Sequence, residues 1–317
     1  MSELAIFARD QLLGSLEAVS HRVYPKLKYT RYFPVKPMPS YEWENTFEAV
    51  EFDSFGIATV LADSANDGGL VGVIARRTRY PIKTLSDYTR IPWLTIQQCQ
   101  SKGVPIDDMY ASALIYGMEK KHNAIAYSGD TDYGLQGIFT SQIPRMNALS
   151  TFAAAATPRA QLDIMNTAIA AVMNNCRGMY SPTILAMPST QYNRLASNIY
   201  TDATGKTVLA SFRETQAELL QITEIILDDE LIGRGENGTD AMLVLPGFGG
   251  LNADLADSPT GTNSADHAPI YYGVPKEFTI PPEFLQWDDQ IFRERAISRT
   301  CGLIVEDPLT ALIVSGI

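Results

Sequence analysis

Residues 104–139 read VPIDDMYASALIYGMEKKHNAIAYSGDTDYGLQGIF, and this stretch decides the fold. Apolar or small side chains recur every three or four positions, which predicts one long amphipathic helix over residues 104–127 with one buried stripe. The predicted stripe consists of Ile106, Met109, Tyr110, Ala113, Leu114, Gly117, Ala124 and Ile125, with an interruption at Lys121. Gly129 stands where a left-handed residue commonly ends a helix. A glycine-punctuated loop and a short strand are expected next.

The loop after this helix carries a specific pattern, Ser128-Gly129-Asp130 followed by Gly134-Leu135-Gln136-Gly137-Ile138. A long helix followed by this pattern resembles the spine of tailed-phage major capsid proteins of the Hong Kong 97 fold, which the cellular encapsulin shells share. The resemblance implies an α+β chain with an N-terminal arm, an extended β-hairpin loop, a peripheral domain and an axial domain. The residues that match the family motif are Gly129, Asp130, Gly134, Leu135 and Gly137.

The element order along the chain follows the same plan. The expected ranges are 1–40 for the N-terminal arm, 41–95 for the extended hairpin loop and its flanking strands, 96–150 for the peripheral domain with the spine helix 104–127, 151–270 for the axial domain, and 271–317 for a C-terminal return to the peripheral domain.

The arm is basic and rich in proline. Because proline favours extended backbone and cannot donate to a ladder, residues 21–40 are interpreted as an extended arm, with an ordinary surface linker as the alternative. In the family such arms lie along neighbouring subunits. Arg22, Lys26 and Lys28 are therefore candidate interface residues, and they are hypothesised to make the inner face of a shell less negative.

Two segments rich in β-branched and aromatic residues, 46–61 and 70–85, flank a strong turn signal. A two-stranded excursion buries little on its own, so a neighbouring subunit is expected to supply the missing contacts. The alternative is a hairpin packed on its own domain. The candidate interface residues in the turn are Asp63, Asn66, Asp67, Gly68 and Gly69.

The second half of the chain mixes helix and strand patterns, which favours an α+β domain. A helix over 157–177 is predicted with Thr157 as its cap and Pro158 in its first turn. The other predicted elements are strands at 183–187, 219–227 and 241–245 and a helix at 190–197. At the C-terminus, alternation on both sides of Glu306-Asp307-Pro308 predicts a hairpin over 291–315.

Composition limits the function. The 317 residues are 45% hydrophobic and 19% charged, which is typical of a globular protein, and the net charge of −11 disfavours general wrapping of nucleic acid. The three cysteines and three histidines lie far apart and suggest neither a disulfide framework nor a metal site. The sequence contains no run of about 18 apolar residues, so no membrane span is predicted. Charges within the first ten residues argue against a signal peptide, so a reducing cytoplasm is expected.

Four patterns resemble chemical motifs but fail in detail. Residues 203–207, ATGKT, lack the first glycine of a phosphate-binding loop, since Tyr200 stands there, and are better explained by a turn at Thr204-Gly205. Residues 247–252 lack a parallel βαβ context, and Asp130-Thr131-Asp132 does not continue as a calcium loop. Asp266-His267 has no accompanying nucleophile. No cofactor, metal or catalytic residue is therefore expected.

The sequence is consequently interpreted as that of a non-enzymatic phage major capsid protein. The resemblance implies pentamers and hexamers that close into an icosahedral shell around double-stranded DNA, bound without sequence specificity. It also implies scaffolding, portal and cement proteins as partners, and a virion capsid assembled in the host cytoplasm. One alternative is an encapsulin-like compartment around a cargo enzyme. The other is a soluble α/β enzyme that uses the acidic loops of residues 228–266.

Some relatives in this family crosslink their subunits through a lysine in the extended loop. Residues 56–75 contain no lysine, and Lys83 is the only lysine in residues 41–95. Autocatalytic crosslinking is therefore not expected for this chain.

Overall fold

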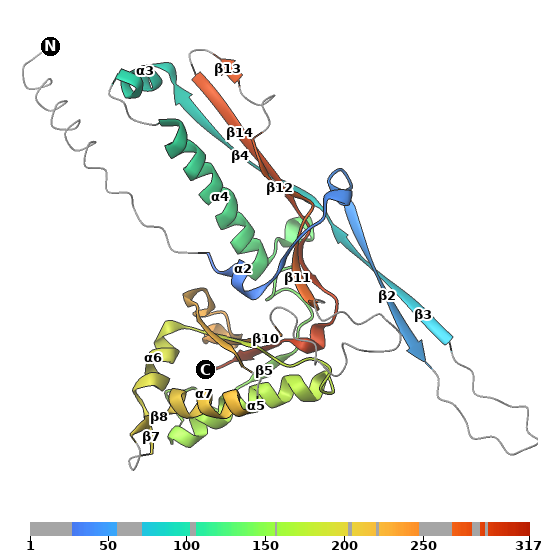
Figure 1. Cartoon of the computed structure of the whole chain (residues 1–317), viewed down its shortest axis with the longest axis vertical. Coiled ribbons are helices and arrows are strands. Elements are labelled where there is room, and N and C mark those ends of the chain that lie inside the picture. The colour runs from blue at the N-terminus through green and yellow to red at the C-terminus, as the bar shows by residue number, and fades with distance from the viewer. Residues whose placement is uncertain are drawn as a thin grey trace, which may run out of the picture.

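The computed structural model describes residues 27–55, 72–101, 106–155, 157–201, 205–219, 222–246, 268–280, 286–288 and 291–317. The molecule is elongated (Figure 1): a long helix and a long strand ladder form one end, a sheet covered by helices forms the other, and a hairpin projects sideways. The predicted spine helix is present as α4, Ile106–Ser128. It packs along a ladder in which β4, Lys83–Pro92, pairs antiparallel with β14, Ile291–Thr300.

The predicted buried stripe of α4 is confirmed at Leu114 and Ile125, which are buried. It is wrong at Ala113 and Ala124, which are exposed, and it omits Met118, which is buried. The sequence pattern misleads because the stripe includes a histidine. His122 is only 7% exposed, and its ring nitrogens lie 2.9 Å from the Tyr272 hydroxyl and 3.1 Å from the Ser298 hydroxyl. These hydrogen bonds satisfy the polar ring of His122 and so allow it to be buried. A search for apolar periodicity does not place a histidine in the buried stripe.

Two further strands pair with the edge of β14 that faces away from β4, one near each end of β14. One is β12, Lys276–Thr279, and the other is β13, Gln286–Asp288. The short helix α3, Trp93–Ser101, follows β4 at the far end of the molecule. A separate three-stranded sheet has the order β1-β11-β15, with bounds Val35–Pro37, Ile270–Val274 and Gly302–Val305.

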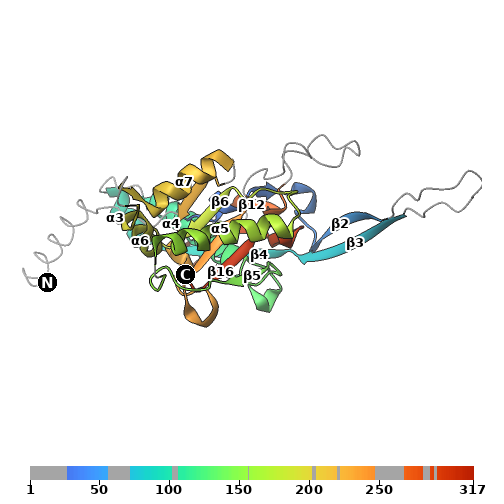
Figure 2. The same ribbon diagram turned by 90° about the horizontal axis from the view of Figure 1, so that it is seen from below.

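The extended hairpin is present as β2, Thr46–Phe55, and β3, Gly72–Pro81. Ten residue pairs, from Thr46 with Pro81 to Phe55 with Gly72, are in antiparallel register. Among the hairpin residues whose burial is described, Ala49 and Tyr80 at the base are buried and pack with other apolar residues. Figure 2 shows the hairpin projecting away from the rest of the molecule. The predicted turn between the strands lies outside the described residues.

The opposite end is built on a five-stranded sheet with the order β5-β16-β10-β6-β9. Its strands are Arg145–Asn147, Leu312–Ser315, Ala241–Leu245, Ile184–Met187 and Glu224–Leu227. The hairpin predicted over 291–315 is wrong, because β14 pairs with β4, whereas β16 lies between β5 and β10. A 3₁₀ turn at Pro308–Thr310 separates β15, which belongs to the three-stranded sheet, from β16, which belongs to the five-stranded sheet. The five domain ranges stay predictions, but this pairing argues for placing residues 312–315 with the axial part.

Helices cover one face of the five-stranded sheet (Figure 2). They are α5, Pro158–Asn175, α6, Ser189–Ser197, and α7, Val208–Leu219. The predicted cap of α5 is confirmed, because Thr157 accepts a hydrogen bond from the Ala160 amide. Helix α7 was not predicted, because its buried positions include the polar Gln216. The strand predicted over 219–227 is shorter in the structure and begins at Glu224. The predicted turn near Gly205 is consistent with the pairing of β7, Ile199–Thr201, and β8, Lys206–Thr207.

The other face of the sheet joins the two ends of the molecule. Its side chains pack with the C-terminal part of α4, with β11 and with the short helix α2, Tyr29–Tyr32. The sheet is thus buried on both faces, which explains why β6, β10 and β16 read as continuous apolar runs rather than as alternating patterns. None of the helices described is long and apolar enough to cross a bilayer.

Candidate assembly interface

The family motif forms a tight turn at the end of α4. Gly129 and Gly134 adopt positive φ angles of 67° and 73°, which glycine adopts without steric cost. Asp130 and Leu135 exchange two backbone hydrogen bonds of 2.9 Å. The Asp130 carboxylate also lies 3.0 Å from Lys121 Nζ. The turn is thereby closed on itself and fastened to the helix that precedes it.

Gly137 lets this turn pack directly against the helix backbone. A Cβ at this position would lie 2.3 Å from the Gly129 nitrogen and 2.5 Å from the Ile125 carbonyl oxygen. The neighbouring Gln136 accepts a hydrogen bond of 2.9 Å from the Leu303 amide in β15. The five motif residues are therefore brought together, and they join the spine helix to the sheet strand β15.

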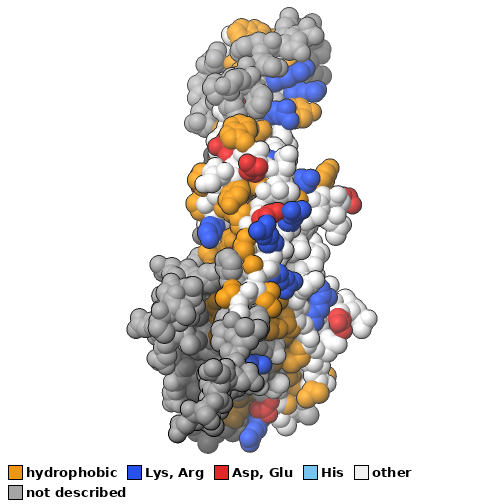
Figure 3. Space-filling view, turned by 90° about the vertical axis from the view of Figure 1, so that its right-hand side faces the viewer, with side chains coloured by type: hydrophobic (Ala, Val, Ile, Leu, Met, Phe, Trp, Pro, Cys, Tyr) orange, Lys and Arg blue, Asp and Glu red, His pale blue; other side chains and the backbone are white. Residues whose placement is uncertain are grey.

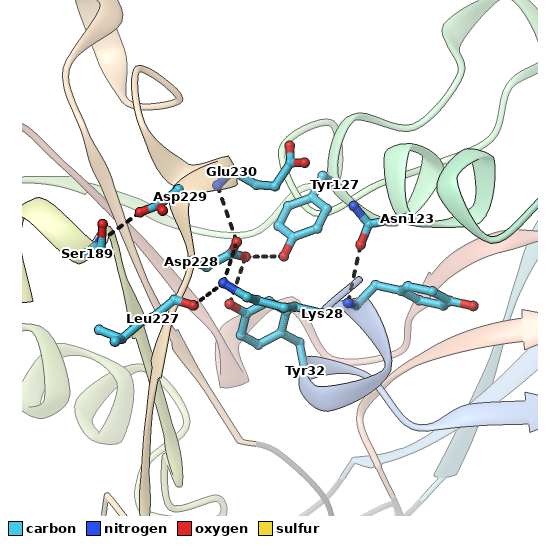
Figure 4. Close-up of polar contacts among 10 residues, drawn as sticks. Lys28, Tyr32, Asn123, Tyr127, Ser189, Leu227, Asp228, Asp229 and Glu230 are labelled. Carbon is cyan, nitrogen blue, oxygen red and sulfur yellow. Dashed lines mark hydrogen bonds and ion pairs between the residues drawn. The ribbon is translucent and has the colours of Figure 1, made fainter. Parts of the chain in front are cut away.

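A buried carboxylate links three separate segments next to this turn (Figure 4). Asp228, which is 2% exposed, accepts hydrogen bonds from Tyr32 of α2 at 2.8 Å and from Tyr127 of α4. Its other oxygen accepts from the Glu230 amide at 3.2 Å and lies 3.6 Å from Lys28 Nζ. We call these five residues the Asp228 cluster. It holds the N-terminal segment, the spine helix and the loop after β9 in one arrangement.

The tyrosines of this cluster act as donors. Burial, assisted by the negative charge of Asp228, raises the pKa of the Tyr32 hydroxyl well above its ordinary value. Burial likewise raises the pKa of Tyr127, with further contributions from Tyr32 and Asp228. Both hydroxyls consequently stay protonated at neutral pH. The carboxylate then accepts hydrogen bonds from two neutral donors and interacts with one lysine ammonium group.

Of the three candidate interface residues in the arm, Arg22, Lys26 and Lys28, the structure describes Lys28. Besides its ion pair with Asp228, it donates to the carbonyl oxygen of Leu227 in β9. Arg31 lies 2.5 Å from Glu224 at the other end of the same strand. The arm thus covers the outer edge of the five-stranded sheet, where open backbone groups would otherwise invite pairing. Lys28 serves the fold of its own subunit.

A cleft of about 620 Å³ opens beside the Asp228 cluster. Arg234 lines it and donates to the Ser128 hydroxyl at 2.9 Å, at the end of α4. Asp229 also lines the cleft, and hydrogen bonds from the side chain and backbone of Ser189 lower its pKa. The described residues contain no group of three metal-ligating side chains.

The hairpin β2–β3 exposes large apolar side chains. Val50, Val73 and Ile74 are 46%, 67% and 59% exposed. At its base, Trp43 is 80% exposed, with Lys276 Nζ located 4.9 Å from the ring centre. Exposed aromatic and aliphatic anchors of this kind are typical of interaction surfaces rather than of the rest of a protein surface.

The other predicted interface residues lie outside the described part of the chain: Arg22, Lys26, Asp63, Asn66, Asp67, Gly68 and Gly69. Their roles stay predictions. Sequence reasoning missed the Asp228 cluster. Asp228 is the first of three consecutive acids, and no local pattern distinguishes it from Asp229 or Glu230. Its partners are 101 and 196 residues away in the chain, so only the fold identifies it.

Comparison with known proteins decides the family. A family model described as major capsid protein matches residues 56–246. The chain belongs to this family. This capsid protein is therefore a structural component of a homo-oligomeric shell and not an enzyme, and the predicted family is confirmed. No curated protein matches the sequence.

Solved structures confirm the Hong Kong 97-like α+β fold over nearly the whole chain. The capsid of Myoviridae Phage XM1 is similar with a TM-score of 0.72 at 16% identity, covering 96% of this chain and 98% of the other. Mycobacterium phage Bobi gives 0.62 at 12% identity, covering 94% and 92%. The virus-like particle from Pyrococcus furiosus gives 0.53 at 14% identity, covering 99% and 100%.

Proposed function

We propose that this capsid protein assembles as pentamers and hexamers into an icosahedral shell that encloses double-stranded DNA in a virion. The hairpin carries the proposal. Ten paired residues per strand extend from the subunit, and their exposed apolar side chains need a partner surface. Repeated contacts between one surface and a different surface on the next copy close into rings and shells. Assembly in the host cytoplasm, with scaffolding, portal and cement proteins, belongs to the same proposal.

The test is negative-stain electron microscopy of the protein expressed alone, with light scattering on the same sample. We expect uniform hollow shells or discrete pentamers and hexamers. A monomer or dimer that persists at high concentration would contradict assembly by this chain alone. Particles purified from infected cells should in addition contain nuclease-resistant double-stranded DNA without a preferred sequence.

The second candidate is an encapsulin-like compartment that encloses a cargo enzyme. It is favoured by the similarity to the virus-like particle from Pyrococcus furiosus over 99% of the chain. The contents of purified native particles separate the two functions. Nuclease-resistant DNA of genome length supports the virion, whereas a stoichiometric co-purifying enzyme without DNA supports the compartment.

The basic arm is proposed to face the packaged DNA. Charge reversal of Arg22 and Lys26 should lower the yield of genome-filled particles, because fewer cations would then oppose the phosphates. Lys28 is left unchanged in this test because its loss would leave Asp228 without its ion pair. An unchanged yield of filled particles would refute this role of the arm.

Covalent crosslinks between subunits are not expected, since residues 56–75 contain no lysine. Boiled particles should therefore run as a single band near 34.9 kDa on a denaturing gel. A ladder of higher bands would show that this prediction is wrong.

A further inference from the structure

The hairpin β2–β3 leaves the body of the subunit at a root that is held in two places. The first is apolar, where Ala49 and Tyr80 pack against the three-stranded sheet. The second is polar and involves residues 42–45, which directly precede β2. On the other strand, Ile82 alone separates β3 from β4, and its amide donates a hydrogen bond of 2.8 Å to the Asn45 carbonyl oxygen. The root is therefore short, and its contacts decide where the hairpin points.

Two cations of the ladder hold residues 42–45. Arg299 of β14 donates from its two terminal nitrogens to the carbonyl oxygens of Glu42 and Glu44, the latter at 2.9 Å. Lys276 of β12 lies with its Nζ 2.7 Å from the Glu42 carboxylate. The register places Lys276 directly opposite Arg299. We call Lys276 and Arg299 the clamp pair.

The clamp pair has a cost that its contacts with the hairpin root offset. Like charges directly opposite on neighbouring strands are destabilising, and the buried Arg299 Nε has no hydrogen-bond partner among the described residues. The Glu42 carboxylate and the two carbonyl oxygens compensate for this cost. The clamp pair orders a segment that burial cannot order, because residues 43–45 are all exposed. Polar contacts, and not apolar packing, therefore fix residues 42–45.

The length of the hairpin makes its direction sensitive to the root. Ten residues per strand extend about 33 Å, so a turn of about 10° at the root moves the far end by about 6 Å. A rod that is held at one point can pivot, whereas a second point fixes its direction. Figure 3 views the molecule from the side toward which the hairpin projects, where apolar side chains are separated by charged ones. A partner has to meet this surface in one alignment, and a displacement of about 6 Å exceeds the distance between neighbouring strands.

We propose that Lys276 and Arg299 are positioning residues for assembly. The apolar contacts of Ala49 and Tyr80 form a pivot, and the clamp pair is the second point, which fixes the angle between the hairpin and the ladder. This inference rests on the proposed function, in which the hairpin meets another molecule. The clamp pair acts within its own subunit: it holds the hairpin in the direction that assembly requires, which lowers the ordering cost at the moment of association.

Distances within one unassembled subunit test the proposal. Spin labels are attached at Ile74→Cys, on the hairpin, and at Lys120→Cys, on the exposed side of α4, with Cys99→Ser to remove the native thiol that is not buried. Pulsed electron paramagnetic resonance on dilute subunits gives the distribution of the distance between the labels. Arg299→Lys keeps the charge but cannot donate to two carbonyls in a fixed geometry, so we expect it to broaden this distribution about twofold.

Two further variants complete this measurement. Lys276→Met removes the ion pair with Glu42 and should also broaden the distribution, and it decides the question if Arg299→Lys does not fold. Arg295→Lys is the control, because it is the same substitution four residues earlier on β14, where Arg295 donates to Ser86 of β4. It should leave the distribution unchanged. A wild-type distribution in folded Arg299→Lys would overturn the proposal.

Assembly gives an independent measurement. The circular dichroism spectrum and the thermal midpoint of Arg299→Lys should stay close to those of the wild type, whereas the yield of uniform particles in electron microscopy should fall by about fivefold or more. A lowered midpoint with a normal yield would show that Arg299 only stabilises its own subunit, and this would overturn the proposal. A wild-type chain that forms no particles would instead refute the proposed function. The distance measurement would still stand in that case, because it uses unassembled subunits.

Discussion

At the scale of single residues, Asp228 holds the side chains of Tyr32, Tyr127 and Lys28 together. Substitution by alanine removes the acceptor for Tyr32 and Tyr127 and leaves the Lys28 ammonium group without its carboxylate. Breaking a buried ionic network in this way costs about 3–5 kcal/mol. We expect Asp228→Ala to lower the free energy of unfolding in urea by about this amount. Asp229→Ala is the control, since among the described residues that exposed carboxylate hydrogen-bonds to Ser189 alone, and an equal loss would contradict the prediction.

His122 makes stability depend on pH. Burial lowers the pKa of its ring from 6.5 to about 4. As the pH falls below 6.5, the unfolded chain therefore binds a proton before the folded chain does. The contribution of His122 to stability is complete above pH 6.5 and is lost as the pH falls to about 4, with a total of about 3 kcal/mol.

The comparison with His122→Gln isolates this effect from the acids of the chain. The free energy of unfolding of wild type and variant is measured in urea from pH 7.5 to pH 4. We expect the advantage of the wild type over the variant to shrink by roughly 3 kcal/mol across this range. An advantage that is independent of pH would show that the ring titrates normally in the folded protein.

At the scale of elements, the turn after α4 depends on the absence of a side chain at one position. Gly137→Ala places a Cβ 2.3 Å from a backbone nitrogen that cannot move without opening the turn. We expect a loss of at least about 3 kcal/mol in unfolding free energy, or no soluble protein. Gly178→Ala is the matched control: its φ is 76° but no atom lies within 4 Å, so only about 1–2 kcal/mol should be lost. Equal effects would contradict the packing argument.

Local patterns predicted the elements better than their partners. The spine helix, the Thr157 cap and the strand Ala241–Leu245 were predicted from periodicity and capping chemistry. Each of these signals involves residues that are close together in the sequence. The pairing of β14 with β4 joins Ile291 to Pro92, and no local signal encodes so distant a register. The turn at Gly129 was predicted because its motif is local in the sequence. The role of Asp228 was identified only in the folded structure, because its partners are distant in the sequence.

At the scale of the whole molecule, the hairpin is expected to serve assembly and not folding. Removing residues 51–76 and joining Val50 to Arg77 by Asn-Gly keeps a register pair and a suitable two-residue turn. The buried base with Ala49 and Tyr80 remains. We expect a thermal midpoint close to that of the wild-type subunit and no particles in electron microscopy. Particles of normal size would show that other surfaces suffice, and an unfolded subunit would show that the hairpin stabilises its own chain.

The position of β16 has a consequence for synthesis on the ribosome. Residues 312–315 fill the place between β5 and β10, so β5 has no neighbouring strand and β10 has an open edge until this segment has left the exit tunnel. A nascent chain therefore exposes the edge of β10, together with apolar side chains that later lie inside the core. Folding of this end must therefore wait until residues 312–315 have been translated. Shell formation would accordingly draw on finished subunits, because a growing chain has no complete sheet to present.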